Sequence, residues 1–113
     1  DSNEPLIEAM RRELIEETSI KNIKVLKEFN QWLEYELPEN LVGKIWRGKY
    51  RGQKQKWFVV KFLGNDNEIN INTKHPEFIE WQWVNIEQLP NIIVFFKKHV
   101  YQEITTELKK IIN

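Results

Sequence analysis

A continuous run of aromatic and β-branched residues in the middle of the chain constrains its fold most. The run occupies residues 57–63 and reads Trp-Phe-Val-Val-Lys-Phe-Leu. Such a run is typical of a short strand that is covered on both faces. Earlier in the chain, Leu33, Tyr35 and Leu37 alternate with glutamates, which predicts a half-buried strand. The middle of the chain is therefore predicted to be β.

Shorter alternations extend this prediction toward the C-terminal half. Ile69 and Ile71 alternate with asparagines, and Trp81 and Trp83 alternate with polar residues. The cluster at 64–67, Gly-Asn-Asp-Asn, predicts a turn before these segments. Four or five short strands are expected in total.

Helical periodicity is found at both ends of the chain. A first helix is predicted to be capped by Ser2 or Asn3, to carry Pro5 in its first turn and to end near Thr18. A second helix is predicted after Pro90, with one apolar stripe. The stripe consists of Ile93, Phe96, Val100, Ile104, Leu108 and Ile111. Two helices that flank short strands favour a layered α/β domain.

Composition narrows the class of protein. The 113 residues fit a single domain over 1–113, and 41% hydrophobic with 30% charged residues is typical of a globular chain. The absence of cysteine excludes disulfides, zinc fingers and a thiol nucleophile. No apolar run approaches the ~20 residues of a membrane span, and no signal segment opens the sequence. These features are compatible with a cytoplasmic protein that has no membrane partner.

The first predicted helix carries three carboxylates on one arc, Glu13, Glu16 and Glu17. Like charges at these spacings repel, and the helix dipole disfavours negative charge in the last turns. Glu13 and Glu17 also project toward the apolar side of the helix, at about 100° per residue. A divalent cation relieves all three problems, and oxygen-only ligands suit Mg²⁺ or Mn²⁺ rather than zinc.

The alternative is an acidic helix end that basic neighbours neutralise in part. Arg11, Arg12 and Lys21 are close enough in sequence for this role. Acidic triplets are common on surface helices, so the spacing alone does not decide between the two interpretations.

A longer motif contains these carboxylates. Glu4, seven further residues and the segment Arg12-Glu-Leu-Ile-Glu-Glu-Thr-Ser-Ile20 resemble the Nudix box, E-x7-R-E-U-x-E-E-x-G-U, where U is apolar. The box is the signature of hydrolases that act on nucleoside diphosphates linked to another group. Ser19 stands where the family has glycine, a tolerable replacement after a helix at some conformational cost.

The resemblance covers roughly the C-terminal two-thirds of such an enzyme. The box's opening glycine would precede Asp1, and the family's first strands and glycine-rich loop have no counterpart here. The resemblance implies a Nudix-type α/β/α sandwich with a mixed sheet, without its N-terminal strands. Sheet edges or apolar surface are then expected to be uncovered.

The segment from Asn40 to Asn65 is basic and aromatic. Seven basic residues and no acidic one occur in it: Lys44, Arg47, Lys49, Arg51, Lys54, Lys56 and Lys61. Trp46, Tyr50, Trp57 and Phe58 lie among them. This composition suits a polyphosphate or a single-stranded RNA end, and equally a solubilising loop beside an ordinary core strand.

Four short stretches narrow the resemblance to one branch of the family. They are Gln53-Lys-Gln-Lys-Trp-Phe58, Trp32-Leu-x-Tyr35-x-Leu-Pro38, Pro76-Glu-Phe78 with Trp81-x-Trp83-Val84, and Phe96-Lys97 ahead of Val100-Tyr101. They resemble the RNA pyrophosphohydrolase branch, which includes bacterial invasion-associated and plant-type dinucleoside polyphosphate hydrolases.

The resemblance implies a role for each matching residue. Glu13, Glu16, Glu17 and the distant Glu77 would bind Mg²⁺ or Mn²⁺, and Arg12 would position the glutamates. Glu17 is favoured as the catalytic base, with Glu77 as its rival. The substrate-binding residues would be Gln53, Lys56 and Lys97 on the 5′ phosphates, Phe96 stacked on a base, and Tyr35 along the RNA path. Phe96 and Tyr35 fit core positions equally well, and Glu77 fits an ordinary loop carboxylate.

The expected reaction removes pyrophosphate from a 5′-triphosphorylated RNA end, leaves a 5′ monophosphate and promotes RNA decay. One alternative is hydrolysis of diadenosine tetraphosphate, and another is a non-catalytic RNA- or nucleotide-binding module. A third is a fragment that is inactive because the phosphate-facing loop is missing.

His75 and His99 are interpreted as incidental, and neither a nucleophilic triad nor a G-x-x-x-x-G-K-[ST] loop is present. A DNA partner is not expected, and the sequence leaves the oligomeric state open.

Overall fold

The computed structural model describes residues 3–42 and 51–112 and divides into two compact units. The first unit comprises Asp1–Lys27 and Phe58–Trp83, and the second comprises Glu28–Trp57 and Val84–Asn113. Of the basic and aromatic segment, Lys44, Trp46, Arg47, Lys49 and Tyr50 lie outside the described residues.

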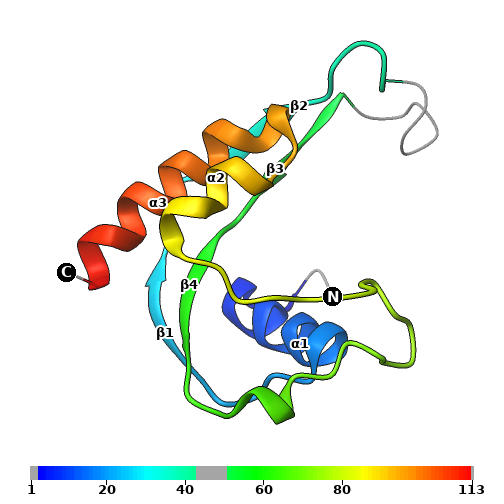
Figure 1. Cartoon of the computed structure of the whole chain (residues 1–113), viewed down its shortest axis with the longest axis vertical. Helices are drawn as coiled ribbons and strands as arrows, with labels where there is room; N and C mark the ends of the chain where they lie inside the picture. Colours follow the sequence, from blue (N-terminus) through cyan, green and yellow to red (C-terminus); the bar gives the residue numbers. More distant parts are fainter. Residues whose placement is uncertain (1–2, 43–50, 113) are drawn as a thin grey trace. The chain divides into compact units, whose positions relative to one another are not determined.

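The first unit contains a helix and a pair of strands (Figure 1). Helix α1 spans Leu6–Thr18, and strand β1 (Ile23–Glu28) pairs with β4 (Phe58–Phe62). At one end of the pair Leu63 donates to the carbonyl of Asn22, and at the other Phe29 donates to that of Trp57. The residue before one strand thus meets the residue after the other, so the two strands run antiparallel.

Helix α1 ends where the sequence predicts, but it begins a few residues later than predicted. Pro5, expected inside the first turn, is the N-cap residue and makes no side-chain cap. The carbonyl of Pro5 accepts the first helical hydrogen bond, from the N–H of Ala9 over 3.0 Å, while the proline itself, which has no N–H to donate, stays just outside the helix. No residue of α1 is fully buried, and Leu6 and Ile15 are exposed. The expectation of uncovered apolar surface therefore holds for this helix.

The strand predicted over the central run is present but is not covered on both faces. In β4 only Val59 is buried, and Lys61 is exposed. The two later alternations do not form strands, because residues 69–85 have no ladder partner among the described residues. An alternating sequence becomes a strand only when a neighbour accepts its backbone hydrogen bonds. The predicted turn at 64–67 leads into a short 3₁₀ turn, η2 (Asp66–Glu68).

The second unit contains an antiparallel pair, β2 (Leu33–Glu36) and β3 (Gly52–Gln55). Their register places Tyr35 opposite Gln53. Leu33, Tyr35 and Leu37 are buried and the intervening glutamates are exposed, which confirms the predicted alternation. Of the strands predicted one by one, β2 and β4 are present, whereas β1 and β3 were not predicted, and the four described strands form two two-stranded sheets rather than one mixed sheet.

The single C-terminal helix predicted from the apolar stripe is interrupted. The structure has η3 (Ile86–Gln88), α2 (Leu89–Ile92), η4 (Phe95–Lys97) and α3 (Lys98–Ile112). Ile93 and Val94 adopt extended backbone angles between α2 and η4. Three consecutive β-branched residues, Ile92 to Val94, disfavour the helical conformation at this point. Phe96 therefore lies in a 3₁₀ turn and not on the helix.

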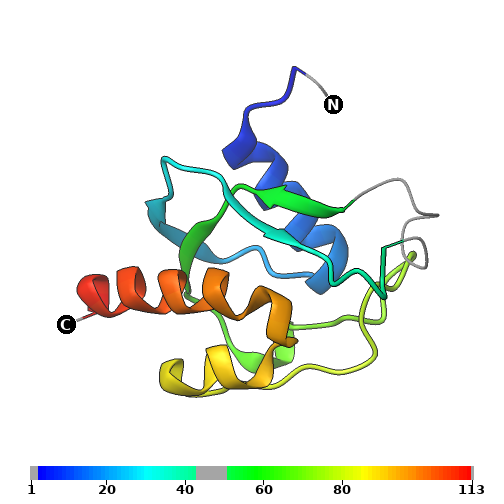
Figure 2. The ribbon, with the colours of Figure 1, turned by 90° about the horizontal axis from the view of Figure 1, so that it is seen from above.

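Helix α3 covers the buried side of β2. Figure 2 shows α2 beside α3, and both α2 and β2 contact α3. Val100 and Ile104 of α3 are buried, as the stripe predicts, together with Phe29. The ring of His99 donates from Nε2 to the carbonyl of Glu34 over 2.8 Å, which joins the start of α3 to β2. None of the described helices is long and apolar enough to cross a membrane.

Candidate functional site

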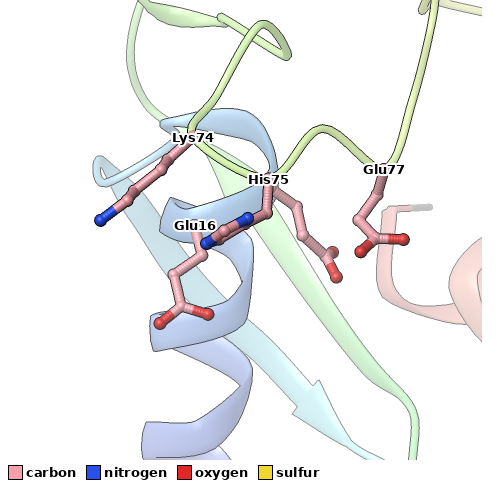
Figure 3. A pocket seen from close by; sticks show the side chains of 5 residues that line it. Glu16, Lys74, His75 and Glu77 are labelled. Carbon is pink, nitrogen blue, oxygen red and sulfur yellow. The ribbon is translucent and has the colours of Figure 1, made fainter.

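A pocket of about 450 Å³ in the first unit gathers charged side chains from two segments (Figure 3). Glu16 and Glu17 come from the last turns of α1. Lys74, His75 and Glu77 come from the loop 69–85. The pocket thus joins two of the three helical glutamates to the distant Glu77.

The C-terminal end of α1 holds this loop in place. The backbone N–H of Asn70 donates to the carbonyl of Thr18 over 2.9 Å, and the Ser19 hydroxyl donates to the carbonyl of Asn70 over 3.0 Å. Ser19 makes the second bond from a left-handed conformation, with φ of 67°. The positive φ ends the helix, and the two hydrogen bonds at this end hold the loop beside the glutamates.

Arg12 binds the carboxylates around it. Its Nη2 lies 3.1 Å from Glu4 Oε1, its Nε lies 3.1 Å from Glu4 Oε2, and its Nη1 lies 3.1 Å from Glu16 Oε2. The Glu13 carboxylate is 3.8 Å from Nη2. These hydrogen bonds lower the pKa of Glu4 and raise that of Arg12, because each favours the charged form. One guanidinium therefore orients Glu4 and Glu16 by charge-assisted bonds.

Glu17 differs from the other two helical glutamates. It is half-buried, whereas Glu13 and Glu16 are exposed. The expected projection toward the apolar side thus holds for Glu17 and is wrong for Glu13, which lies near Arg12 instead. The pKa of Glu17 is raised, first by burial and then by the negative charges of Glu13, Glu77 and Glu16. No described residue forms an ion pair with it.

The predicted metal ligands are brought near one another but do not converge. Across residues 3–42 and 51–112, no group of three or more His, Asp or Glu side chains is arranged to hold a metal ion. Glu16 is occupied by Arg12. The donor set is oxygen-only, which hard divalent cations prefer, and Glu17 concentrates negative charge. The type of ligand that these residues offer therefore fits Mg²⁺ or Mn²⁺.

Four of the five predicted substrate residues lie together in the second unit. The Tyr35 hydroxyl donates to Gln53 Oε1 over 3.0 Å. The ring of Tyr35 lies 5.6 Å from that of Phe96, and the Lys97 ammonium lies 5.0 Å from the Tyr35 ring centre. Tyr35 itself is only 4% exposed. This buried side chain therefore contacts all three of Gln53, Phe96 and Lys97.

Lys56, the fifth predicted substrate residue, interacts elsewhere in the same unit. Its ammonium donates to the carbonyl of Phe29 and lies 3.4 Å from the Glu28 carboxylate. The side chain is 11% exposed. In this conformation Lys56 ties the residues before β2 to those after β3.

A shallow groove of about 230 Å³ follows the β2–β3 hairpin past Gln53. Its charged lining consists of Glu34, Glu36, Arg51 and Lys54. The two glutamates on β2 balance the two basic residues in or next to β3, so the lining is close to neutral. The Gln53 oxygen is engaged by Tyr35, which leaves its amide nitrogen as the group that can donate to a ligand.

Comparison with known proteins decides the family. The family model of the NUDIX domain matches residues 1–104, which include both the α1 carboxylates and Glu77. This chain belongs to the Nudix family.

The curated relatives of this Nudix chain include several RNA pyrophosphohydrolases. The one from Pelagibacter ubique is 54% identical over 113 residues, which make up 100% of this chain and 72% of that protein. Those from Bartonella clarridgeiae and Wolbachia pipientis are 46% and 44% identical, over 65% and 70% of their lengths. The chain thus spans about two-thirds of the length of these relatives.

The structure adds Lys74 and His75 to the Nudix carboxylates. The sequence interpretation treated His75 as incidental and did not consider Lys74, yet both line the pocket with Glu16, Glu17 and Glu77. Their nearness to Glu77 in the sequence was the available signal. Nothing in their spacing indicated that the loop returns to α1.

Proposed function

We propose that this Nudix chain is a metal-dependent hydrolase that removes pyrophosphate from the 5′ triphosphate of RNA and leaves a 5′ monophosphate. The observation that carries the proposal is the position of Glu17. This carboxylate is half-buried at the end of the family's box, faces three other carboxylates and has no cationic partner among the described residues. Unpaired carboxylates crowded together do not stabilise a surface helix, whereas they can bind a cation that in turn binds a phosphate chain.

Glu16, Glu17 and Glu77, which line the pocket, would hold the cation, with Glu13 near Glu17. When bound, Mg²⁺ or Mn²⁺ draws charge from the polyphosphate oxygens and makes a nearby water more acidic. Glu77 is included because it lines the same pocket as Glu16 and Glu17 and its charge acts on Glu17.

Glu17 is the base in this proposal. Its raised pKa makes the carboxylate a better proton acceptor than an ordinary surface glutamate. It accepts the proton of the water that adds to the α phosphorus, while the bond to the β phosphate breaks and pyrophosphate leaves. Glu77 is the rival base. Arg12 touches no substrate and fixes the orientation of Glu16 through two hydrogen bonds.

The second unit supplies the binding groups. Lys97 and the amide nitrogen of Gln53 contact the 5′ phosphates, and Phe96 stacks on a base near the 5′ end. Tyr35 positions these three groups from its buried place beneath them. Lys56 joins them on the phosphates only if it releases Glu28. The Nudix α/β/α sandwich with a mixed sheet is the wider framework of this proposal.

The decisive experiment compares turnover of 5′-triphosphorylated RNA and of diadenosine tetraphosphate by the 113-residue chain, with Mg²⁺ or Mn²⁺. We expect release of pyrophosphate from the RNA at the higher kcat/KM. The variants Glu16→Gln and Glu17→Gln should each lose more than about tenfold, or roughly 1.4 kcal/mol of barrier. Glu8→Gln, on the first turn of the same helix, is the matched control and should leave turnover unchanged.

Other outcomes select the alternatives. Faster turnover of diadenosine tetraphosphate identifies a dinucleoside polyphosphate hydrolase. RNA binding with turnover that survives both glutamine substitutions, or with none at all, points to a binding module or to a segment that needs further residues. With this substrate we also propose a cytoplasmic location and a role in RNA decay.

A further inference from the structure

Lys74 places a positive charge in the pocket that the carboxylates line. Glu16, Glu17, His75 and Glu77 line the same pocket, and in the view of Figure 3 His75 lies between Lys74 and Glu77. The Lys74 side chain is exposed and forms no hydrogen bond or ion pair with any described residue. Opposite charges in one pocket attract each other, so a lysine that pairs with none of three carboxylates is available to a ligand.

The charges that act on Glu17 show how this pocket is divided. Burial raises the pKa of Glu17, and the negative charges of Glu13, Glu77 and Glu16 raise it further. A cation close to the carboxylate would lower this pKa, but Lys74 has no such effect on it. The Lys74 ammonium is therefore held away from the Glu17 carboxylate. The pocket thus has an acidic part and a separate positive group.

The backbone on either side of Lys74 is restricted. Before it, the N–H of Asn72 donates to Oδ1 of Asn70 over 2.9 Å, and Asn70 is itself bound to the end of α1. After it, Pro76 fixes its own φ and disfavours the helical conformation of the residue that precedes it. The loop therefore carries Lys74 beside α1, and a ligand has to order only its side chain.

A polyphosphate that is bound through a divalent cation matches this division of charge. Carboxylates suit the cation, but they repel the phosphate oxygens that the cation does not neutralise. A second, separate positive group is then needed for those oxygens. A lysine ammonium is a compact charge that binds phosphate through charge-assisted hydrogen bonds.

We propose that Lys74 is a catalytic residue that contacts the β and γ phosphates of the RNA 5′ end. This inference rests on the proposed function and deepens it, because it assigns a contact to the leaving group. When the bond between the α phosphorus and the bridging oxygen breaks, its electron pair stays on that oxygen of the departing pyrophosphate. Lys74 stabilises this negative charge and keeps its own proton throughout.

The test measures binding of the two reaction products, so no turnover intervenes. Pyrophosphate and 5′-monophosphorylated RNA are each titrated into the 113-residue chain in Mg²⁺, by calorimetry. We expect Lys74→Met to weaken pyrophosphate binding about tenfold, because a charge-assisted contact is lost. Lys74→Arg keeps the charge and should stay within about threefold of the wild type. The monophosphorylated RNA lacks the β and γ phosphates, so Lys74→Met should bind it as the wild type does.

Lys24→Met is the matched control. Lys24 is an exposed lysine on β1 in the same unit and is not among the residues that line the pocket. This variant loses the same charge and should bind both products normally. Because Lys74 and Lys24 are exposed, neither replacement should change the thermal midpoint, which circular dichroism checks.

The inference is wrong if Lys74→Met binds pyrophosphate within about twofold of the wild type, or if the wild type does not bind it in Mg²⁺. Equal losses for both products also contradict it, because they indicate a general attraction of anions. A further outcome separates the two proposals. If pyrophosphate binding depends on Lys74 but the wild type hydrolyses neither RNA nor diadenosine tetraphosphate, the proposed function is wrong and the pyrophosphate contact of Lys74 stands.

Discussion

Glu77 in the loop 69–85 lies close enough to Glu17 on α1 for its charge to raise the pKa of the Glu17 carboxyl. The hydrogen bonds between Asn70 and the end of α1 bring the two segments together. The carboxylates of α1 and the carboxylate of Glu77 thus form one cluster of negative charge. Within this cluster, Arg12 forms an ion pair with Glu16, whereas Glu17 forms none with any described residue.

The first prediction concerns stability and pH. Because the folded-state pKa of Glu17 is raised above 4.5, the native chain binds this proton more tightly than the unfolded chain. Its contribution is therefore present at low pH and is lost as pH rises from 4.5 through the folded-state pKa. At pH 7 without metal, Glu17→Gln should raise the thermal midpoint by about one to three degrees, a figure discounted for solvent screening. Melting curves from pH 4 to 8 in chelator check this, and a lower midpoint at pH 7 contradicts it.

A second prediction concerns the metal. A cation that binds the folded chain alone raises the thermal midpoint as its concentration rises above Kd. Adding Mg²⁺ or Mn²⁺ should therefore stabilise the wild type, and Glu17→Gln and Glu77→Gln should lose most of this gain. Glu8→Gln should retain it. A midpoint that no divalent cation shifts, in any of these chains, speaks against a metal site.

Arg12 provides a third prediction. Lysine keeps the charge but cannot make the paired hydrogen bonds that Arg12 makes to Glu4 and Glu16. We expect Arg12→Lys to lower kcat about tenfold with little change in KM, because it orients a carboxylate and does not contact substrate. Arg11→Lys, one residue earlier on the helix, is the control. An unchanged kcat in Arg12→Lys would show that only the positive charge matters, and equal losses in the two variants would show that the effect is not specific to Arg12.

Ser19 provides a fourth prediction, on backbone strain. Its φ of 67° costs an L-residue about 1–2 kcal/mol, while its hydroxyl binds the carbonyl of Asn70. Ser19→Ala keeps the strain and loses the bond, so it should destabilise the chain by about 1 kcal/mol. Ser19→Gly loses the bond and relieves the strain, so it should be nearly neutral. Urea unfolding of both variants measures the difference, and a glycine variant less stable than the alanine variant contradicts the strain argument.

The fifth prediction compares two glycines. A Cβ at Gly52 would lie 1.9 Å from the backbone oxygen of Tyr35, so Gly52→Ala must separate β2 from β3. We expect a loss of about 2 kcal/mol or more and weaker RNA binding, since Gln53 follows directly. At Gly64 the nearest atom belongs to the Glu68 carboxylate, 1.7 Å away, which can rotate aside. Gly64→Ala should cost less than about 1 kcal/mol by the same unfolding assay.

Local patterns were predicted well because their causes are local. The alternation of Leu33, Tyr35 and Leu37 and the end of α1 follow from side-chain periodicity and from the residues themselves. The Trp81 and Trp83 segment was predicted as a strand and is not one, because a strand needs a partner that periodicity does not specify. The break at Ile93 and Val94 was missed because the apolar stripe continues across it.

The sequence by itself determined the carboxylate-bearing helix, the family motif and the types of residue available for phosphate and base. These depend on spacing along one segment, which the chain carries without folding. Only the tertiary structure decided that Glu17 has no cationic partner among the described residues, that Lys74 and His75 line the same pocket, and that Tyr35 is buried and contacts Gln53 and Lys97. The reason is that burial and charge pairing arise between segments far apart in sequence, and they are set by the hydrogen bonds that hold the loop 69–85 at the end of α1 and by the register of β2 with β3.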